Sequence, residues 1–94
     1  MVTVQIEHPI RDYATWRAAF DRDPAGRQGA GVRRYRVYRP VDDPNYVMVD
    51  LDFDTADAAE RFVAVMRGIW QRVEGTLIDG PRARIVECID EHAY

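Results

Sequence analysis

The chain has 94 residues, 47% of them hydrophobic and 31% charged, with a formal net charge of −3. This is the balance of a globular protein, and the length predicts one domain over residues 1–94 that buries about 60–65% of its unfolded surface. The acidic charge, with a pI near 5.3, argues against a nucleic-acid or anionic-lipid partner.

Two residue types are absent, and their absence excludes whole classes of chemistry. All 13 basic residues are arginine, and the chain contains neither lysine nor serine. Serine hydrolases, Schiff-base lysine enzymes and P-loop kinases are therefore excluded. The single cysteine, Cys88, excludes an internal disulfide and a cysteine-rich zinc site. We expect neither a metal nor a cofactor.

The sequence also lacks the patterns of export and membrane insertion. No apolar run reaches 18 residues, so we expect no membrane span. The apolar opening is too short for a signal peptide, and a single free thiol suits a reducing compartment. These observations predict a cytoplasmic protein.

The first third of the chain predicts a strand, a helix and a loop. Residues 2–8 alternate strictly, which indicates a strand with one buried face, and Pro9 is expected to end it. Asp12 is a suitable N-cap for a helix that continues to about residue 23. Its apolar stripe consists of Tyr13, Trp16, Ala19 and Phe20. Residues 24–31 are predicted to form a flexible loop.

The rest of the chain predicts a hairpin, a long helix and a last strand. Residues 32–39 and 46–53 are strands joined by a turn of proline, aspartate and asparagine. Residues 55–73 follow a 3.6-residue apolar period, with Gly75 expected to end the helix. The last strand is expected over 83–90, and its facing stays open.

The order β-α-β-β-α-β predicts a ferredoxin-like α+β sandwich, with two helices on one face of an antiparallel sheet. Right-handed crossovers then place the first and third strands at the centre. The helix-free face carries arginines and aspartates from the hairpin. One register pairs Arg34 with Asp50, and the other pairs Arg34 with Asp52. This face is either solvated or the interface of a dimer with paired charges.

Two segments resemble a known superfamily. The opening VQIEHPIRDYATWRAAFD and the hairpin VYRPVDDPNYVMVDLDFD are similar to those of small proteins in the dimeric α/β-barrel superfamily, closest to its antibiotic-biosynthesis-monooxygenase-like branch. The resemblance implies a homodimer whose two sheets pack face to face into a barrel. It does not extend to the haem-degrading members, because residues 55–75 lack their histidine.

Candidate site residues come from the helix-facing side of the predicted sheet. His8 ends the first strand on that side, where a neutral imidazole is a candidate base, and Tyr13 is a second candidate for proton transfer. Four aromatic residues are candidates for the wall of a substrate pocket: Trp16, Tyr35, Phe62 and Trp70. The plainer interpretation is that these aromatic residues are simply core and that His8 is structural.

Two functions remain open. The first is a dimeric protein that binds a small hydrophobic or aromatic molecule without catalysis. The second is a cofactor-independent monooxygenase, or a cyclase or isomerase, that acts on a small aromatic or polyketide-like substrate. No combination of nucleophile, base and oxyanion partner stands out in the sequence to decide between them.

Overall fold

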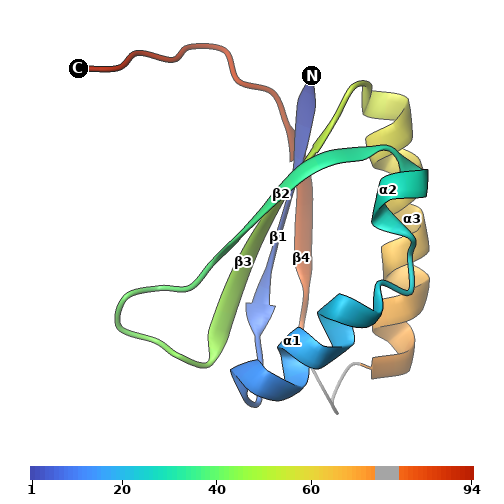
Figure 1. Cartoon of the computed structure of the whole chain (residues 1–94), viewed down its shortest axis with the longest axis vertical. Coiled ribbons are helices and arrows are strands. Elements are labelled where there is room, and N and C mark those ends of the chain that lie inside the picture. Colours follow the sequence, from blue (N-terminus) through green and yellow to red (C-terminus); the bar gives the residue numbers. More distant parts are fainter. Residues whose placement is uncertain (74–78) are drawn as a thin grey trace.

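The computed structural model describes residues 1–73 and 79–94. In order, its elements are β1 (Val2–Pro9), α1 (Tyr13–Arg22), α2 (Arg27–Ala30), β2 (Val32–Tyr38), β3 (Tyr46–Phe53), α3 (Ala56–Val73) and β4 (Arg82–Val86). In this part of the chain the four strands form an antiparallel sheet in the order β2-β3-β1-β4. The helices lie on one face of it (Figure 1). The predicted ferredoxin-like fold, with β1 and β3 at the centre, is confirmed.

Strand alternation places the core on the helix side of the sheet. The register of β1 and β3 pairs Val4 with Leu51 and Ile6 with Val49, so these side chains share one face. The long helix packs its predicted stripe onto that face. The core comprises Val4, Ile6, Ile10, Trp16, Val47, Val49, Leu51, Phe53, Ala59, Phe62, Val63 and Trp70.

Side-chain caps fix where the two longer helices begin. The Asp12 carboxylate accepts the Thr15 backbone N–H at 2.7 Å, as the sequence predicts for an N-cap. At the start of α3 the Thr55 hydroxyl accepts the Ala58 N–H at 3.2 Å. None of the helices among the described residues is long and apolar enough to cross a membrane.

The predicted loop over residues 24–31 is wrong in one respect, since it contains the short helix α2. The Asp23 carboxylate accepts the Arg27 N–H at 2.9 Å, and the Gly26 carbonyl accepts the Ala30 N–H at 2.9 Å. Gly31 ends the helix with φ at 104°, a left-handed conformation that favours glycine. These local hydrogen bonds form a helical turn that the glycine-rich composition does not predict.

Strand β1 ends at Pro9, as the sequence predicts, but proline does not break its pairing with β3. Pro9 pairs with Tyr46, and the Ile10 N–H donates to the Asn45 carbonyl at 2.8 Å, so the pairing with β3 continues past it. Pro9 directs its carbonyl to the other side, where it accepts the Asp79 N–H. Because β4 pairs with β1 only up to Glu7, the N–H that proline lacks removes no ladder bond.

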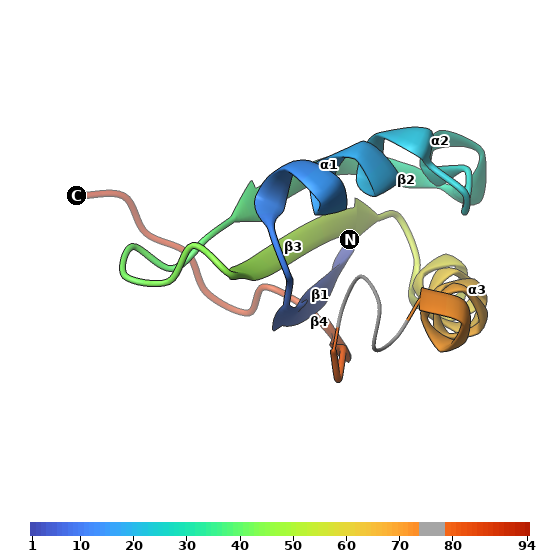
Figure 2. The same cartoon turned by 90° about the horizontal axis from the view of Figure 1, so that it is seen from below.

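The last strand is shorter than predicted, because β4 ends at Val86 instead of residue 90. Its pairing with β1 resolves the facing: Ile85 lies opposite Val4 and packs against the core. Residues 87–94 leave the sheet and extend past its helix-free face, as does the tip of the β2–β3 hairpin (Figures 1 and 2). The expected stop at Gly75 lies outside the described residues.

The helix-free face carries a polar network in one of the two predicted registers. Arg34 lies opposite Asp52, and its guanidinium contacts the Asp52 carboxylate at 2.9 Å. The Thr3 hydroxyl donates to the same carboxylate at 2.7 Å. These hydrogen bonds hold the pKa of Asp52 below its usual range, and the bond from Thr3 has the largest effect. The Asp52 carboxylate is thus already partnered within one chain.

Phe53 provides a test of the core. The side chain is fully buried, and its ring centroid lies 5.3 Å from that of Phe62. We expect Phe53→Ala to lower the free energy of unfolding by about 3–5 kcal/mol through lost burial and the cavity left behind. Urea denaturation measures this. Val65→Ala, at an exposed position on α3, is the control and changes the midpoint little. Equal midpoints for the two variants would contradict this account of the core.

Candidate functional site

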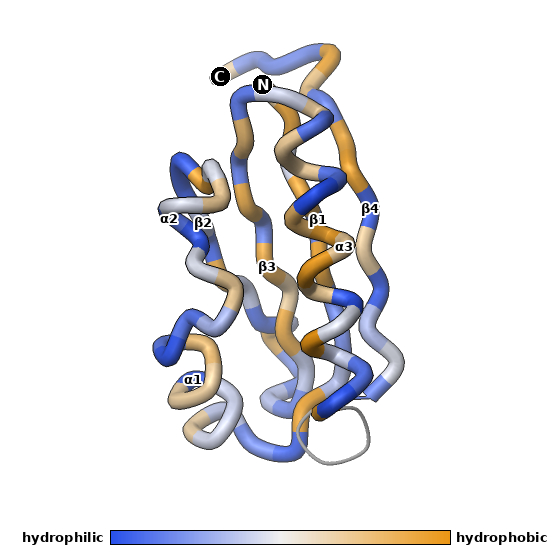
Figure 3. The backbone as a smooth tube through the Cα atoms, turned by 90° about the vertical axis from the view of Figure 1, so that its right-hand side faces the viewer, coloured by the Kyte–Doolittle hydropathy of each residue, from blue (hydrophilic) through white to orange (hydrophobic). Residues whose placement is uncertain are grey.

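A cavity of about 410 Å³ lies between the sheet and the helices α1 and α3. Its floor comes from β1 and β3, and Figure 3 shows β3 behind the space that separates the two helices. The lining is Ile6, His8, Trp16, Ala19, Phe20, Arg22, Asp23, Pro24, Ala25, Arg27, Val49, Leu51, Phe62, Met66, Ile69, Trp70, Arg72 and Val73. This size and apolar lining are typical of small-molecule sites.

His8 is the polar group in the floor of this cavity. Alternation places it on the helix side of β1, opposite Val47, and only 3% of it is exposed. Its Nδ1 lies 3.1 Å from the Pro9 carbonyl oxygen. A carbonyl only accepts, so this bond assigns the proton of a neutral ring to Nδ1 and leaves the lone pair on Nε2.

The second nitrogen of His8 is accessible. Among the described residues Nε2 has no hydrogen-bond partner, and no buried polar side-chain atom lacks one. It follows that Nε2 reaches accessible space, and His8 lines the cavity. Burial lowers the pKa of His8, and the bond to Pro9 opposes this only in part. His8 is therefore a neutral base at pH 7.

Three of the four aromatic residues predicted for a pocket wall line the cavity. Trp16 comes from α1, while Phe62 and Trp70 come from α3. Each is 6% exposed or less. The His8 ring lies 6.4 Å from the Trp16 ring, so the candidate base borders an aromatic surface. The structure thus brings together four of the six predicted site residues: His8, Trp16, Phe62 and Trp70.

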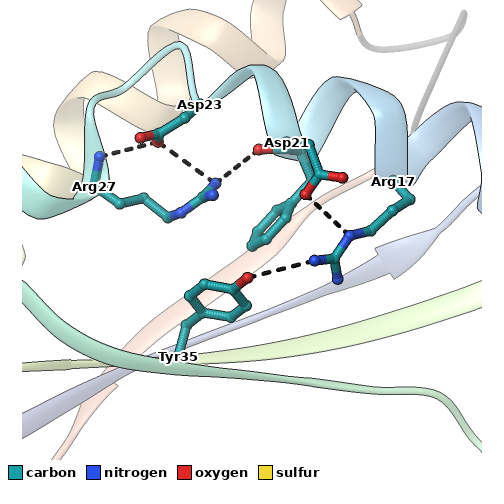
Figure 4. A network of polar contacts seen from close by, with 6 residues as sticks. Arg17, Asp21, Asp23, Arg27 and Tyr35 are labelled. Atoms are coloured by element: carbon teal, nitrogen blue, oxygen red, sulfur yellow. Dashed lines mark hydrogen bonds and ion pairs between the residues drawn. The ribbon is translucent and has the colours of Figure 1, made fainter.

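Tyr13 and Tyr35 do not line this cavity. The partly buried Tyr13 ring lies 5.8 Å from the Trp16 ring, and the Tyr13 hydroxyl raises the pKa of Arg17 by hydrogen bonding. The Tyr35 ring contacts the edge of Phe20 at 5.1 Å, and its hydroxyl accepts from Arg17 at 3.4 Å (Figure 4). Both tyrosines thus contact aromatic residues that α1 contributes to the cavity lining.

The α1 wall is fixed by a stacked arginine. The Arg27 guanidinium lies 3.9 Å above the Phe20 ring and donates to the Phe20 carbonyl at 2.9 Å. It also pairs with Asp23 at 3.5 Å (Figure 4). Phe20 in turn stacks on Trp16 at 4.9 Å. One continuous set of contacts therefore runs from the loop before α2 to the cavity surface.

Sequence reasoning missed the polar end of the cavity. Arg22, Asp23, Arg27 and Arg72 line it, and the first and last of these are exposed, so the cavity opens here. Arg22 and Arg72 lie in the last turns of α1 and α3. Arg22 follows Phe20 by two residues and Arg72 follows Trp70 by two residues. This spacing from the apolar stripes is the one feature of the sequence that could have indicated them. No three metal-binding side chains gather anywhere in the described part of the chain.

Comparisons with known proteins identify the fold. No family model and no curated protein matches the chain. Solved structures do match. A variant of SnoaB, a cofactor-independent oxygenase from Streptomyces nogalater, superposes with a TM-score of 0.72 at 18% identity, over 96% of this chain and 94% of that chain.

Two further matches agree. A candidate antibiotic biosynthesis monooxygenase from Bordetella bronchiseptica has a TM-score of 0.74 at 14% identity, over 94% of this chain and 96% of that chain. Rv0793 from Mycobacterium tuberculosis has a TM-score of 0.70 at 18% identity, over 98% of both chains. Identities this low carry the fold alone. The chain has the ferredoxin-like fold of antibiotic-biosynthesis-monooxygenase-like proteins.

The buried state of His8 predicts a pH dependence of stability. Because its folded pKa lies below the ordinary value of 6.5, the unfolded chain binds this proton more readily. The stabilisation is complete above pH 6.5 and is lost as the pH falls towards the folded pKa, with a slope of at most about 1.4 kcal/mol per pH unit. Urea titrations across this range measure it. His8→Gln removes the slope, whereas His92→Gln, in the exposed tail, retains it. A slope that survives His8→Gln would assign it to another group.

Proposed function

We propose that this chain binds a small, largely apolar molecule with an aromatic body in the cavity between the sheet and helices α1 and α3. The observation that carries the proposal is the cavity itself, about 410 Å³ in volume and lined by Trp16, Phe62 and Trp70. Apolar walls of this kind make dispersion contacts with an apolar molecule of matching shape. Binding of such a ligand also removes its own apolar surface from water.

Cofactor-independent oxygenation is a second candidate function, and His8 favours it. A base for such a reaction must be neutral at working pH and must present a lone pair to the substrate. His8 meets both conditions, because burial lowers its pKa and its Nδ1 is engaged by Pro9. The name of SnoaB, a cofactor-independent oxygenase of the same fold, supports this candidate.

The proposed step needs O2 and a substrate with an acidic methylene group. His8 Nε2 takes one C–H proton, and the carbanion forms a carbon–oxygen bond with O2. Reprotonation gives a hydroperoxide, and loss of water converts the methylene to a ketone. One oxygen atom enters the product and the other leaves as water, so the four electrons removed from carbon reduce one O2. Cyclisation or isomerisation would begin with the same proton transfer and consume no O2.

Anthrone, a three-ring ketone with an acidic methylene, tests both candidates. Without O2 we expect it to bind and to quench the fluorescence of Trp16 and Trp70, the chain's two tryptophans. Admission of O2 should start ketone formation with one O2 consumed per product. Loss of the base in His8→Gln should slow this step by about 10²–10⁴-fold, with little change in the anaerobic affinity.

A pair of matched alanines locates the binding. Ala19 lines the cavity, whereas its neighbour Ala18 is exposed and does not. Ala19→Phe should weaken anthrone binding, and Ala18→Phe should leave it unchanged. Anthrone binding without catalysed oxidation would exclude the oxygenase function and support the binding function alone. Equal anthrone affinity in Ala19→Phe and Ala18→Phe would show that the ligand binds outside the cavity.

We also propose that a second copy of the chain covers the helix-free face of the sheet. The sheet's own network supports this, since Asp52 there is only 9% exposed and already paired. The hairpin and the tail, which extend past the same face, carry several exposed apolar residues. Val41, Ile89 and Tyr94 are between 89% and 114% exposed in the single chain. A partner sheet with its own hairpin and tail would cover such groups.

Light scattering tests this assembly. At micromolar concentration we expect a mass of about twice 10.9 kDa. Met48 lies on the helix-free face, and Met48→Asp should shift the mass to that of one chain, because it places an unpaired charge in the interface. Val65→Asp, at an exposed position on α3, should leave the mass unchanged. A monomeric mass for the unsubstituted chain would contradict the proposal.

A further inference from the structure

The open end of the cavity carries charged side chains that the binding of a purely apolar molecule would not require. Its described lining holds three arginines and one acidic residue, Asp23, although the chain as a whole carries a net charge of −3. The remaining lining is aromatic and aliphatic except for His8, which is neutral. Three arginines and one aspartate are therefore the charged groups in the described lining of an otherwise apolar space.

One of the three arginines is already committed to the protein. Arg27 pairs with Asp23, donates to the Phe20 carbonyl and stacks on the Phe20 ring. It is half-buried, and its charge is balanced by the carboxylate beside it. Arg27 with Asp23 therefore contributes no net charge to the opening.

The other two arginines are uncommitted. Arg22 and Arg72 are exposed, and within the described part of the chain neither makes an ion pair or hydrogen bond. They reach the cavity from two different helices, since Arg22 ends α1 and Arg72 lies in the last turn of α3. A favourable interaction with each helix dipole explains either residue singly. It does not explain why both border the same apolar cavity.

We infer that Arg22 and Arg72 select ligands that carry a carboxylate at one end of an apolar body. A guanidinium binds a carboxylate through two parallel N–H donors, and its planar face tolerates contact with aromatic rings. The apolar body then fills the space between Trp16 and Trp70 while the carboxylate stays at the wet opening. This inference rests on the proposed binding function and adds the chemical class of the ligand.

Two ligands of the same shape test the inference. 2-Naphthoate and 2-naphthamide share one ring system and differ in charge. By titration calorimetry at low salt, we expect the naphthoate to bind at least about tenfold more tightly, the effect of one charged hydrogen bond. The preference should shrink as salt is added, because the opening is exposed to solvent.

Variants assign the preference to its residues. The double variant Arg22→Gln with Arg72→Gln should bind both ligands equally, with the affinity for the naphthamide unchanged. Arg67→Gln, an exposed arginine on α3 outside the cavity lining, is the matched control and should keep the preference. The urea midpoint of each variant separates a loss of fold from a loss of binding.

The outcomes separate this inference from the proposed function. Equal affinities for both ligands in the unsubstituted chain overturn the carboxylate selection and leave apolar binding intact. A preference that persists in the double variant also overturns it. Binding of neither ligand overturns both. A preference that is lost in the double variant and kept in Arg67→Gln supports it.

Discussion

The antiparallel pairing of β1 with β3 is the constraint on which the rest of the structure depends. Side chains alternate along each strand, so one register decides which residues face the helices and which do not. The observed register pairs Val4 with Leu51 and Gln5 with Asp50. A slip by one residue would bury Asp50 under the helices and turn Leu51 out to solvent.

The same register places His8 where it is chemically unusual. It stands on the apolar side of β1, two residues beyond Ile6, at the point where α1 and α3 are far enough apart to leave a cavity. The other histidine, His92, lies in the exposed tail. The environment of His8 is therefore a product of strand parity and helix spacing together, and neither alone would create a buried base with a free nitrogen.

Much of the fold could be predicted from the sequence because it depends on periodicity. Alternation over 2–8 and 46–53 and the apolar stripe of α3 each define a buried face, and the order of elements leaves few ways to pack them. Errors arose where local hydrogen bonds override composition. The Asp23 side chain organises α2 within a glycine-rich segment, and the ladder tolerates Pro9 because its missing N–H faces no strand.

The site was less predictable, and its residues show why. Trp16, Phe62 and Trp70 were identified because a helical stripe faces the sheet, but periodicity cannot separate a filled core from a cavity lined by the same side chains. Alternation along β2 places Tyr35 on the helix-facing side of the sheet, where a residue could line the cavity. Phe20, however, lies between Tyr35 and the cavity. Arg22 and Arg72 lie outside any apolar pattern, so only the packing of two helices in three dimensions brings them to one cavity.

His8 is also a polar residue on the otherwise apolar face of β1. A leucine or phenylalanine at this position would extend the apolar face of Val4 and Ile6. It would also avoid the cost of burying a polar ring, and that burial is what lowers the pKa of His8. The bond to Pro9 offsets part of that cost at Nδ1, while Nε2 has no partner among the described residues. Sequences that are otherwise consistent across levels tend to break the pattern at functional sites. The cavity lining therefore contains a neutral base and two exposed guanidinium groups, which packing alone does not require.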